Sequence, residues 1–393
     1  MLLQKGGEVA FCGELGPECC HLVDYFESLG VRKIDRGENP ASWMLQVVNS
    51  DMFVDFAEEY KESQSYYRLK DSLSDINDNA EPKQRVYFKK EFAARRHQRR
   101  VLVNERLRTI YWRSPAYNRL RMVIYLAIAL VLGSVFLPET WAIDSYSETE
   151  MHSLLSTVFI SFIFTGVLAI NSVLPVMLKI RDSFYRHRQA GMLDDVSFAL
   201  GLGVAEKWFI VVSSFLFCVV FLPCAELNLD PGRAISFAGI FCFNTAIYSY
   251  FGQAFMCLVS GMPQAQILAS IFIGLNNFFS GLIVRPQHIY PPFNIAFWFT
   301  PGHFVYEGLV VSLFYNETTP VVATPGSNFY ENLGCSPDME GECVGTVWGY
   351  VDTFFGGKYQ REHLYYDAMV LGFYLTLARL VTYFALKHFT FTA

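Results

Sequence analysis

The sequence predicts a mainly α-helical, polytopic membrane protein with six membrane-spanning helices. Hydrophobic residues make up 52% and aromatic residues 16% of the chain, and its mean hydropathy is +0.24. Residues 234–284 contain no Asp, Glu, Lys or Arg. As one helix this stretch would extend roughly 75 Å, more than twice the ~30 Å thickness of the hydrocarbon core, so it must fold back on itself. The sequence SGMPQ at 260–264 supplies the break.

Residues 1–50 are expected to form a small globular segment. Gly-rich strand and turn signals in KGGEVAFCGELG precede an amphipathic run, CCHLVDYFESLG. Asn39 can cap a helix that starts at Pro40, and Trp43 and Val47 fall on one apolar face of that helix. The segment is too short to bury this face by itself, so we expect the face to be exposed.

Two further segments separate residues 1–50 from the first membrane span. Residues 51–84, which include SLSDINDNAEPK, are predicted to be a polar linker. Residues 85–116 combine a basic face with apolar residues, and Trp112 lies just before the first span, where aromatic belts occur. We therefore expect a connecting helix that lies in the cytosolic interface.

Six apolar segments are long enough to cross a bilayer. They lie near residues 119–138, 152–178, 196–222, 234–259, 264–284 and 365–387. Arg121, near the start of the first, can snorkel to the interface.

Three charges lie away from the ends of these spans, namely Glu206, Lys207 and Arg379. A charge in mid-membrane costs ~2.5–3.5 kcal/mol on insertion scales, so each needs a partner or a route to water. Glu206 could pair with Lys207 or with a basic loop residue. Arg379 should snorkel or find a carboxylate, and a Glu206–Arg379 pair is one hypothesis.

The positive-inside rule gives the orientation. Residues 81–119 carry twelve Lys or Arg against three Glu, and residues 179–188 repeat the basic bias. The segments 138–150 and 223–231 are acidic and lack Lys and Arg. Both termini are therefore expected in the cytosol of an integral protein, which we expect in the plasma membrane. The start, MLLQKGGEVA, lacks the apolar core of a cleavable signal peptide.

The segment at 286–363 is then extracellular. Its first part is apolar but interrupted by prolines, which predicts one or two short re-entrant helices rather than a span. Cys335 and Cys343 could form a disulfide on this side, or remain two free thiols in a mobile loop. Asn316, in the sequence NET, is a candidate glycosylation site.

Several stretches together resemble the full-size pleiotropic-drug-resistance transporters of the G subfamily of ABC transporters. They are GGEVAFCGELG, NPASWML, YWRSPAYNRLR, FYRHRQAGM, FFSGLIVRP and PGHFVYEGLVVSLF, in the family's order over nearly the whole chain. The resemblance implies an ABC-2 type transmembrane domain at 117–393, preceded at 1–50 by the α/β C-terminal remnant of a nucleotide-binding domain. Trp43, Met44 and Val47 would then pack against parts of that domain outside the chain.

The motifs for ATP hydrolysis are not found in the sequence. ATP hydrolysis needs a phosphate-cradling GxxxxGK[S/T] loop and a Walker B carboxylate. The sequence GGKY at 356–359 lacks the upstream Gly and has Tyr after Lys. We therefore expect neither catalytic residues, nor a metal site, nor nucleic-acid binding in this chain, with ATP and Mg²⁺ bound by nucleotide-binding domains that it does not contain.

The resemblance also implies roles for individual residues. The loop between the second and third spans would couple ATP-domain motion to the helices, through Phe184, Tyr185, Arg186, Arg188 and Gly191. The alternative for its arginines is simple positive-inside anchoring. Glu206 matches an acidic residue of the family's third helix, although no Pro follows it here, and Arg379 is not usual in the family.

The second and fifth helices line the substrate path in related transporters. The candidate path residues are Phe159, Phe162, Phe164, Asn276, Asn277 and Phe279. For the phenylalanines the alternative is a packing or lipid-facing role. The two asparagines should face other helices or a cavity, since bare amides are costly in hydrocarbon.

Two functions fit these observations. The first is the membrane half of an ATP-driven exporter of hydrophobic small molecules or lipids, which also needs nucleotide-binding domains and a second six-helix half. The alternative is a truncated, non-transporting membrane scaffold or regulatory partner.

Overall fold

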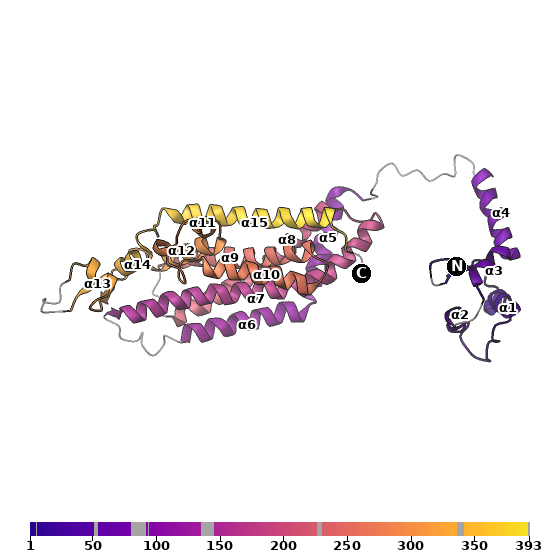
Figure 1. Cartoon of the computed structure of the whole chain (residues 1–393), viewed down its shortest axis with the longest axis horizontal. Helices are drawn as coiled ribbons and strands as arrows, with labels where there is room; N and C mark the ends of the chain where they lie inside the picture. The colour runs from indigo at the N-terminus through magenta and orange to yellow at the C-terminus, as the bar shows by residue number, and fades with distance from the viewer. Residues whose placement is uncertain are drawn as a thin grey trace. The chain divides into compact units, whose positions relative to one another are not determined.

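The computed structural model describes residues 1–4, 6–50, 54–79, 92, 94–134, 145–225, 230–335 and 342–391. The chain divides into two compact units, Met1–Lys90 and Glu91–Ala393. Figure 1 shows a small N-terminal unit of short elements and a long helical bundle.

The N-terminal unit is a small α/β assembly. Its elements are β1 (Leu2–Leu3), β2 (Val9–Phe11), the 3-10 turn η1 (Pro17–Cys19), α1 (Cys20–Ser28), α2 (Pro40–Asn49), α3 (Phe56–Glu62) and α4 (Gln64–Asn79). The strands β1 and β2 pair antiparallel. The cap of α2 is as expected, because the Asn39 side chain accepts a hydrogen bond from the Ala41 amide at 2.9 Å.

The core of this unit closes on its own residues. Trp43 and Val47 are buried, and the Trp43 indole donates to the Arg32 carbonyl at 3.1 Å. Phe56 of α3 packs in the same core. The expectation that Trp43 and Val47 form an exposed face is therefore wrong, because they share a core with residues of β2 and α1 and with Phe56 of α3.

The prediction of a linker at 51–84 needs the same correction. Phe56 and Tyr60 of α3 are buried, and the Tyr60 hydroxyl donates to the Cys12 carbonyl at 2.8 Å. The helix α4 follows directly. The polar composition of the segment hides two aromatic anchors one helical turn apart. Residues 51–53 and 80–84 lie outside the described residues.

The second unit contains the membrane helices. Within the described ranges, five helices are long and apolar enough to span a membrane, namely α6 (Pro115–Ser134), α7 (Glu148–Gln189), α8 (Asp195–Cys224), α9 (Pro231–Leu258) and α15 (His363–His388). The predicted span at 264–284 is represented by α10 (Met262–Phe278), whose 17 residues extend about 26 Å. This helix ends before 284, and Gly281 turns the chain with a φ of +107°.

The bundle is built around α9. This helix packs against α7, α8, α10, α12 (Pro301–Phe314) and α15, and Figure 1 shows the long helices running side by side. Aromatic stacking fills the α8–α9 contact, with the Phe217 and Phe241 ring centroids 4.4 Å apart. Because α9 touches so many helices, its inward-facing residues position the rest of the bundle.

One end of the bundle carries a small sheet, and we call it the sheet end. The order is β3 (Tyr146–Ser147), β4 (Pro320–Val322) and β5 (Val344–Thr346); β3 and β4 are parallel, and β4 and β5 antiparallel. The helices α13 (Asn328–Asn332) and α14 (Val347–Phe355) lie beside it. The sequence did not indicate this sheet, because strands this short form only through tertiary pairing.

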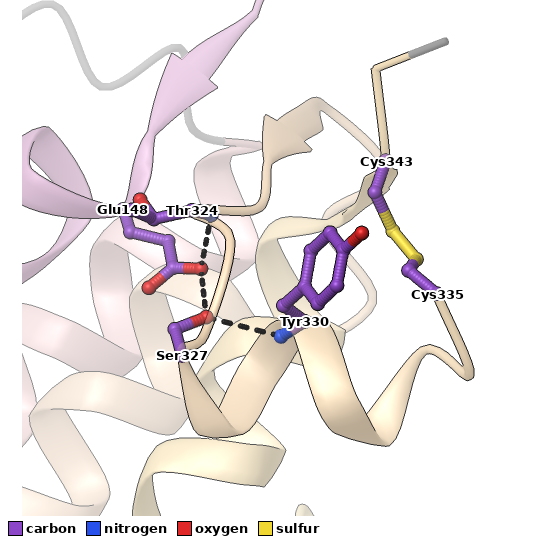
Figure 2. Close-up of a disulfide and its surroundings, with 6 residues drawn as sticks. All are labelled: Glu148, Thr324, Ser327, Tyr330, Cys335 and Cys343. Atoms are coloured by element: carbon purple, nitrogen blue, oxygen red, sulfur yellow. Dashed lines mark hydrogen bonds between the residues drawn. A yellow bond between two sulfur atoms is a disulfide. The ribbon is translucent and has the colours of Figure 1, made fainter. Parts of the chain in front are cut away.

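A disulfide and a carboxylate hold the loop segments at the sheet end. Cys335 and Cys343 are bonded. Figure 2 shows Glu148, at the start of α7, accepting from the Thr324 amide at 2.8 Å and from the Ser327 hydroxyl at 2.6 Å. The segment after α12 is thus tied to the start of α7.

Short helices fill the segment between α10 and β4, in line with the expected re-entrant region. They are η4 (Pro286–His288), α11 (Asn294–Trp298) and α12, and every residue of α12 is buried. Asn316 lies exposed in the turn after α12 with a φ of +56°. Its glycosylation stays a prediction.

The contact between α10 and α12 is close. The Gly302 amide donates to the Asn276 side-chain oxygen at 2.8 Å. A Cβ atom at Gly302 would lie 2.6 Å from the Asn276 backbone carbonyl oxygen. Asn276 therefore faces a neighbouring helix, and only glycine fits opposite it.

We predict that Gly302→Ala lowers the free energy of unfolding by ~1–3 kcal/mol, because backbone must move to accept the methyl group. Gly239→Ala on α9 is the matched control, since nothing lies within 4 Å of a Cβ atom there. Thermal unfolding of both variants in lipid nanodiscs measures the difference. Equal stability of the two variants would show that the contact is not as tight as described.

Candidate functional site

The helix α5 (Arg96–Trp112) packs across the other end of the bundle, which we call the α5 end. Val103, Leu107 and Tyr111 recur one turn apart on its buried face, against α8. Gly201 of α8 permits this contact, because a Cβ atom there would lie 2.9 Å from Val103. An ion pair between Arg99 and Asp194 at 3.3 Å adds a charged contact.

A buried carboxylate, Glu206 of α8, lies close to this contact. The Arg121 guanidinium of α6 donates to Glu206 Oε1 at 2.9 Å, and both side chains are inaccessible to solvent. The Tyr117 hydroxyl donates to the same oxygen. The expected partners of Glu206 were therefore wrong, and Arg121 does not snorkel. It turns inward because Ser249 of α9 accepts from its second nitrogen at 3.0 Å.

Arg379 of α15 joins this cluster indirectly. Its guanidinium donates to Gln253 Oε1 at 2.6 Å and to the Ala199 carbonyl. The Gln253 amide in turn donates to Glu206 Oε2 at 3.4 Å. The direct Glu206–Arg379 pair is thus replaced by a bridge through Gln253. Lys207 is exposed and is not the local partner of Glu206, which pairs with Arg121.

We call this set the polar network. It consists of Tyr111, Tyr117, Arg121, Glu206, Ser249, Gln253 and Arg379, from α5, α6, α8, α9 and α15. Gln253 Nε2 also donates to the Tyr111 hydroxyl at 3.3 Å. A buried charge without a partner is very unfavourable, so moving one of these helices away from the others would cost free energy. The polar network therefore fixes the positions of five helices relative to one another.

The predicted coupling loop is largely helical. The helix α7 continues to Gln189, so Phe184, Tyr185, Arg186 and Arg188 all lie on its last turns. Gly191 follows with a φ of +64°, which makes it a glycine C-cap as expected of a helix break. Apolar length located the membrane part of α7 but not its end, because residues 179–189 are polar without containing a helix breaker.

The last turns of α7 are anchored to two other helices. Phe184 is buried and stacks on Phe198 of α8 with ring centroids 4.1 Å apart. Arg188 donates to the Leu386 carbonyl at the end of α15 and pairs with Asp195 at 3.4 Å. Arg186 is exposed. A displacement of this segment would therefore reach α8 and α15 directly.

Arg181 was not singled out from the sequence, although it is buried. It donates to the Met256 carbonyl at 2.6 Å and to the Ser260 carbonyl at 2.8 Å, so it caps the C-terminus of α9. Gln253 was missed as well. The available signal was its amide in the uncharged stretch 234–284, a polar group of the same kind as those of Asn276 and Asn277.

The candidate substrate-path residues do not gather in one place. Phe159 and Phe162 contact each other, with ring centroids 5.5 Å apart, and pack on Tyr306 in the core. Phe164 has 55% of its surface exposed. Asn276 and Phe279 are buried, and Asn277 is half-buried. Of the phenylalanines on α7, Phe164 alone is free to face another molecule.

The donor chemistry does not point to a metal. Within the described part of the chain, no group of three His, Cys, Asp or Glu side chains could hold a metal ion. The polar network has one carboxylate and two guanidinium groups, so it is built for mutual charge pairing.

Residues 97–314, which include α5 to α12, match the ABC-2 type transporter family. The chain belongs to this family. ABC transporter G family member 48 of Oryza sativa subsp. japonica is 30% identical over 90% of the chain and 25% of its own length. Pleiotropic drug resistance protein 1 of Nicotiana tabacum is 28% identical over 99% of the chain and 26% of its own length. The chain thus spans about a quarter of the curated relatives it matches.

We predict that Arg121→Met alone lowers the free energy of unfolding of this ABC-2 type domain by ~3–5 kcal/mol, because it leaves the Glu206 carboxylate buried and unpaired. Adding Glu206→Gln should recover most of that loss. The control combines Arg379→Met with Glu206→Gln, where the bridge through Gln253 predicts weaker recovery. Stronger coupling in the control pair, measured by thermal unfolding in nanodiscs, would contradict the assignment of Arg121 as the partner.

Proposed function

We propose that the chain is one six-helix membrane half of an ATP-driven exporter that moves hydrophobic small molecules or lipids across the plasma membrane. ATP and Mg²⁺ bind to nucleotide-binding domains outside this chain, and a second six-helix half completes the path. The observation that carries the proposal is the anchored end of α7 beside the polar network, in a chain of the ABC-2 type family.

The α5 end faces the cytosol in this proposal. Its basic residues include Arg99, Arg106 and Lys179, and the positive-inside rule assigns such an end to the cytosol. The sheet end carries the bond between Cys335 and Cys343, a linkage typical of the extracellular side. Both chain termini are then cytosolic.

The segment 184–191 receives the motion of the nucleotide-binding domain. Arg186 is exposed and available for a charged contact, whereas Phe184 and Arg188 are engaged within the bundle. A push on this segment would be transmitted along α7, a single helix of about 63 Å that reaches the sheet end. During this motion, the polar network keeps α5, α6, α8, α9 and α15 in fixed positions relative to one another.

The substrate path lies on the outer face of α7 and α10. These helices pack together, and Phe164 of α7 and Ile271 and Leu275 of α10 are exposed. This face is apolar and is not covered by the described residues of the bundle, which suits contact with a second half and with hydrophobic substrates. Phe159 and Phe162 instead support the path from behind, through their packing on Tyr306.

We predict that Arg186→Glu reduces ATP-dependent export of a hydrophobic fluorescent dye by at least about 5-fold, since charge reversal repels the partner contact. The assay uses inside-out vesicles in which this chain is assembled with its nucleotide-binding domains. Arg119→Glu is the control, because Arg119 is exposed near the same end but lies outside the segment.

Two results would oppose the proposal. Equal losses in both variants would mean that the arginines act only as membrane anchors. Absence of ATP-dependent dye transport in the assembled, correctly inserted complex would favour the scaffold function.

A further inference from the structure

Four titratable side chains meet near the sheet end, apart from the polar network. His303 and Glu307 lie one turn apart on α12, and His363 and Asp367 lie one turn apart at the start of α15. His303 and Asp367 are each 1% exposed and Glu307 is 2% exposed. The His363 side chain is 39% exposed, so it links the cluster to solvent. We call these residues the outer cluster.

Glu307 is the centre of the outer cluster. His363 Nδ1 lies 2.9 Å from Glu307 Oε1, and His303 Nε2 lies 3.4 Å from Glu307 Oε2. Asp367 has no hydrogen-bond partner for either carboxylate oxygen. A buried carboxylate without donors is very unfavourable, so the Asp367 carboxyl calls for a proton or a cation.

Among the described residues, no Lys or Arg forms an ion pair with either of the two carboxyl groups. The His303 ring packs on Phe297, with centroids 3.8 Å apart, and on Trp298. In addition to burial, the positive charge of Lys358 lowers the pKa of His303 by electrostatic repulsion. The Lys358 ammonium group itself donates to the Pro286 carbonyl. Tyr359 also faces the carboxyl groups. The contacts to α7 and α9 are uncharged, as with the Tyr306 hydroxyl on the Leu155 carbonyl and Gly308 beside Ile240.

Burial sets the protonation of the α12 pair. It lowers the pKa of His303 to about 3, with His363 and Lys358 adding to the effect, so His303 is neutral. Burial also raises the pKa of Glu307 from 4.5 to about 8, although the Gln360 backbone acts in the opposite direction. With both carboxyl groups ionised, His363 alone could offset two negative charges. Among the described residues these four side chains are not arranged to hold a metal ion.

We propose that the outer cluster is a proton-binding site, in which the two buried carboxyl groups, those of Glu307 and Asp367, together hold one proton that enters past His363. The bound proton removes the repulsion between the two carboxyl groups and keeps the start of α15 against α12. Its loss leaves two negative charges across that contact and loosens it. This site is independent of the proposed transport function.

The sign of the pH dependence follows from Glu307. Because its pKa is raised in the folded state, the folded chain holds the proton over a range in which the unfolded chain has released it. This contribution to stability is complete below about pH 4.5 and is lost as the pH rises through about 8. The chain should therefore become less stable towards alkaline pH.

Infrared difference spectroscopy tests the site directly, on the full chain in lipid nanodiscs titrated from about pH 5 to about pH 9. We expect a carbonyl band of a protonated carboxylic acid at neutral pH that disappears in the alkaline part of the titration. Glu307→Gln and Asp367→Asn should each shift this band, because one carboxyl group then holds the proton alone, and the double variant should remove it. The single variants test the site if the double variant does not fold. Glu317→Gln is the control, because Glu317 pairs with Arg233 at 2.9 Å at the same end of the bundle and should leave the band unchanged.

Thermal unfolding gives a second measurement. The unfolding temperature of the wild-type chain should fall by about 2–4 °C across the titration, and this fall should disappear in the double variant Glu307→Gln with Asp367→Asn. A band that is absent at neutral pH in the wild-type chain, or that is unchanged in both single variants, or that persists in the double variant, would overturn the proposal. Stabilisation of the wild-type chain by added Zn²⁺ would also overturn it, because the cluster would then be a metal site.

Discussion

A carboxylate inside a membrane helix must be neutralised where it lies, and Glu206 imposes this constraint on the bundle. Its two oxygens need donors, and the donors come from α6 and α9 rather than from its own helix. Each partner is itself held, as Arg121 is by Ser249. Helices that could otherwise slide along apolar surfaces therefore have fixed registers at the α5 end.

The two ends of the bundle are stabilised differently. The α5 end depends on buried charges and on the stacking of Phe184 on Phe198, which are sensitive to small displacements. The sheet end depends on strand pairing, a disulfide and the wholly buried helix α12. In the proposed transport mechanism, a signal at residues 184–191 would begin among these buried charges, and α7 would carry it to a region closed by covalent and apolar contacts.

Local chemistry made part of this fold predictable from the sequence. Uncharged length located the six apolar helices, and Asn39 with Pro40 placed the start of α2, because these signals depend only on neighbouring residues. The resemblance to G-subfamily transporters agrees with the family match and the mainly helical bundle. The short strands β3 to β5 depend on distant pairing and gave no local signal.

The site was less predictable, for the same reason. Glu206 and Arg379 were recognised as buried charges, but their partners depend on which helices are neighbours. The helices α6 and α8 pack together, which brings Arg121 to Glu206. Gln253 then fills the space between Glu206 and Arg379, which no spacing rule anticipates. Tyr60 and Phe56 were overlooked similarly, since a polar segment concealed their tertiary role.

The central claim is that the polar network holds the helices of the α5 end as one rigid body. The most direct test of this rigidity measures the distance between two spin labels by electron–electron resonance. The labels are placed at the exposed positions Leu102 of α5 and Leu380 of α15, and the assembled transporter is measured with and without ATP. The account predicts one narrow distance that ATP does not change, and a broad distribution in the variant Glu206→Gln. A distance that shifts with ATP in the wild-type protein, or that stays narrow without the Glu206 carboxylate, would contradict it.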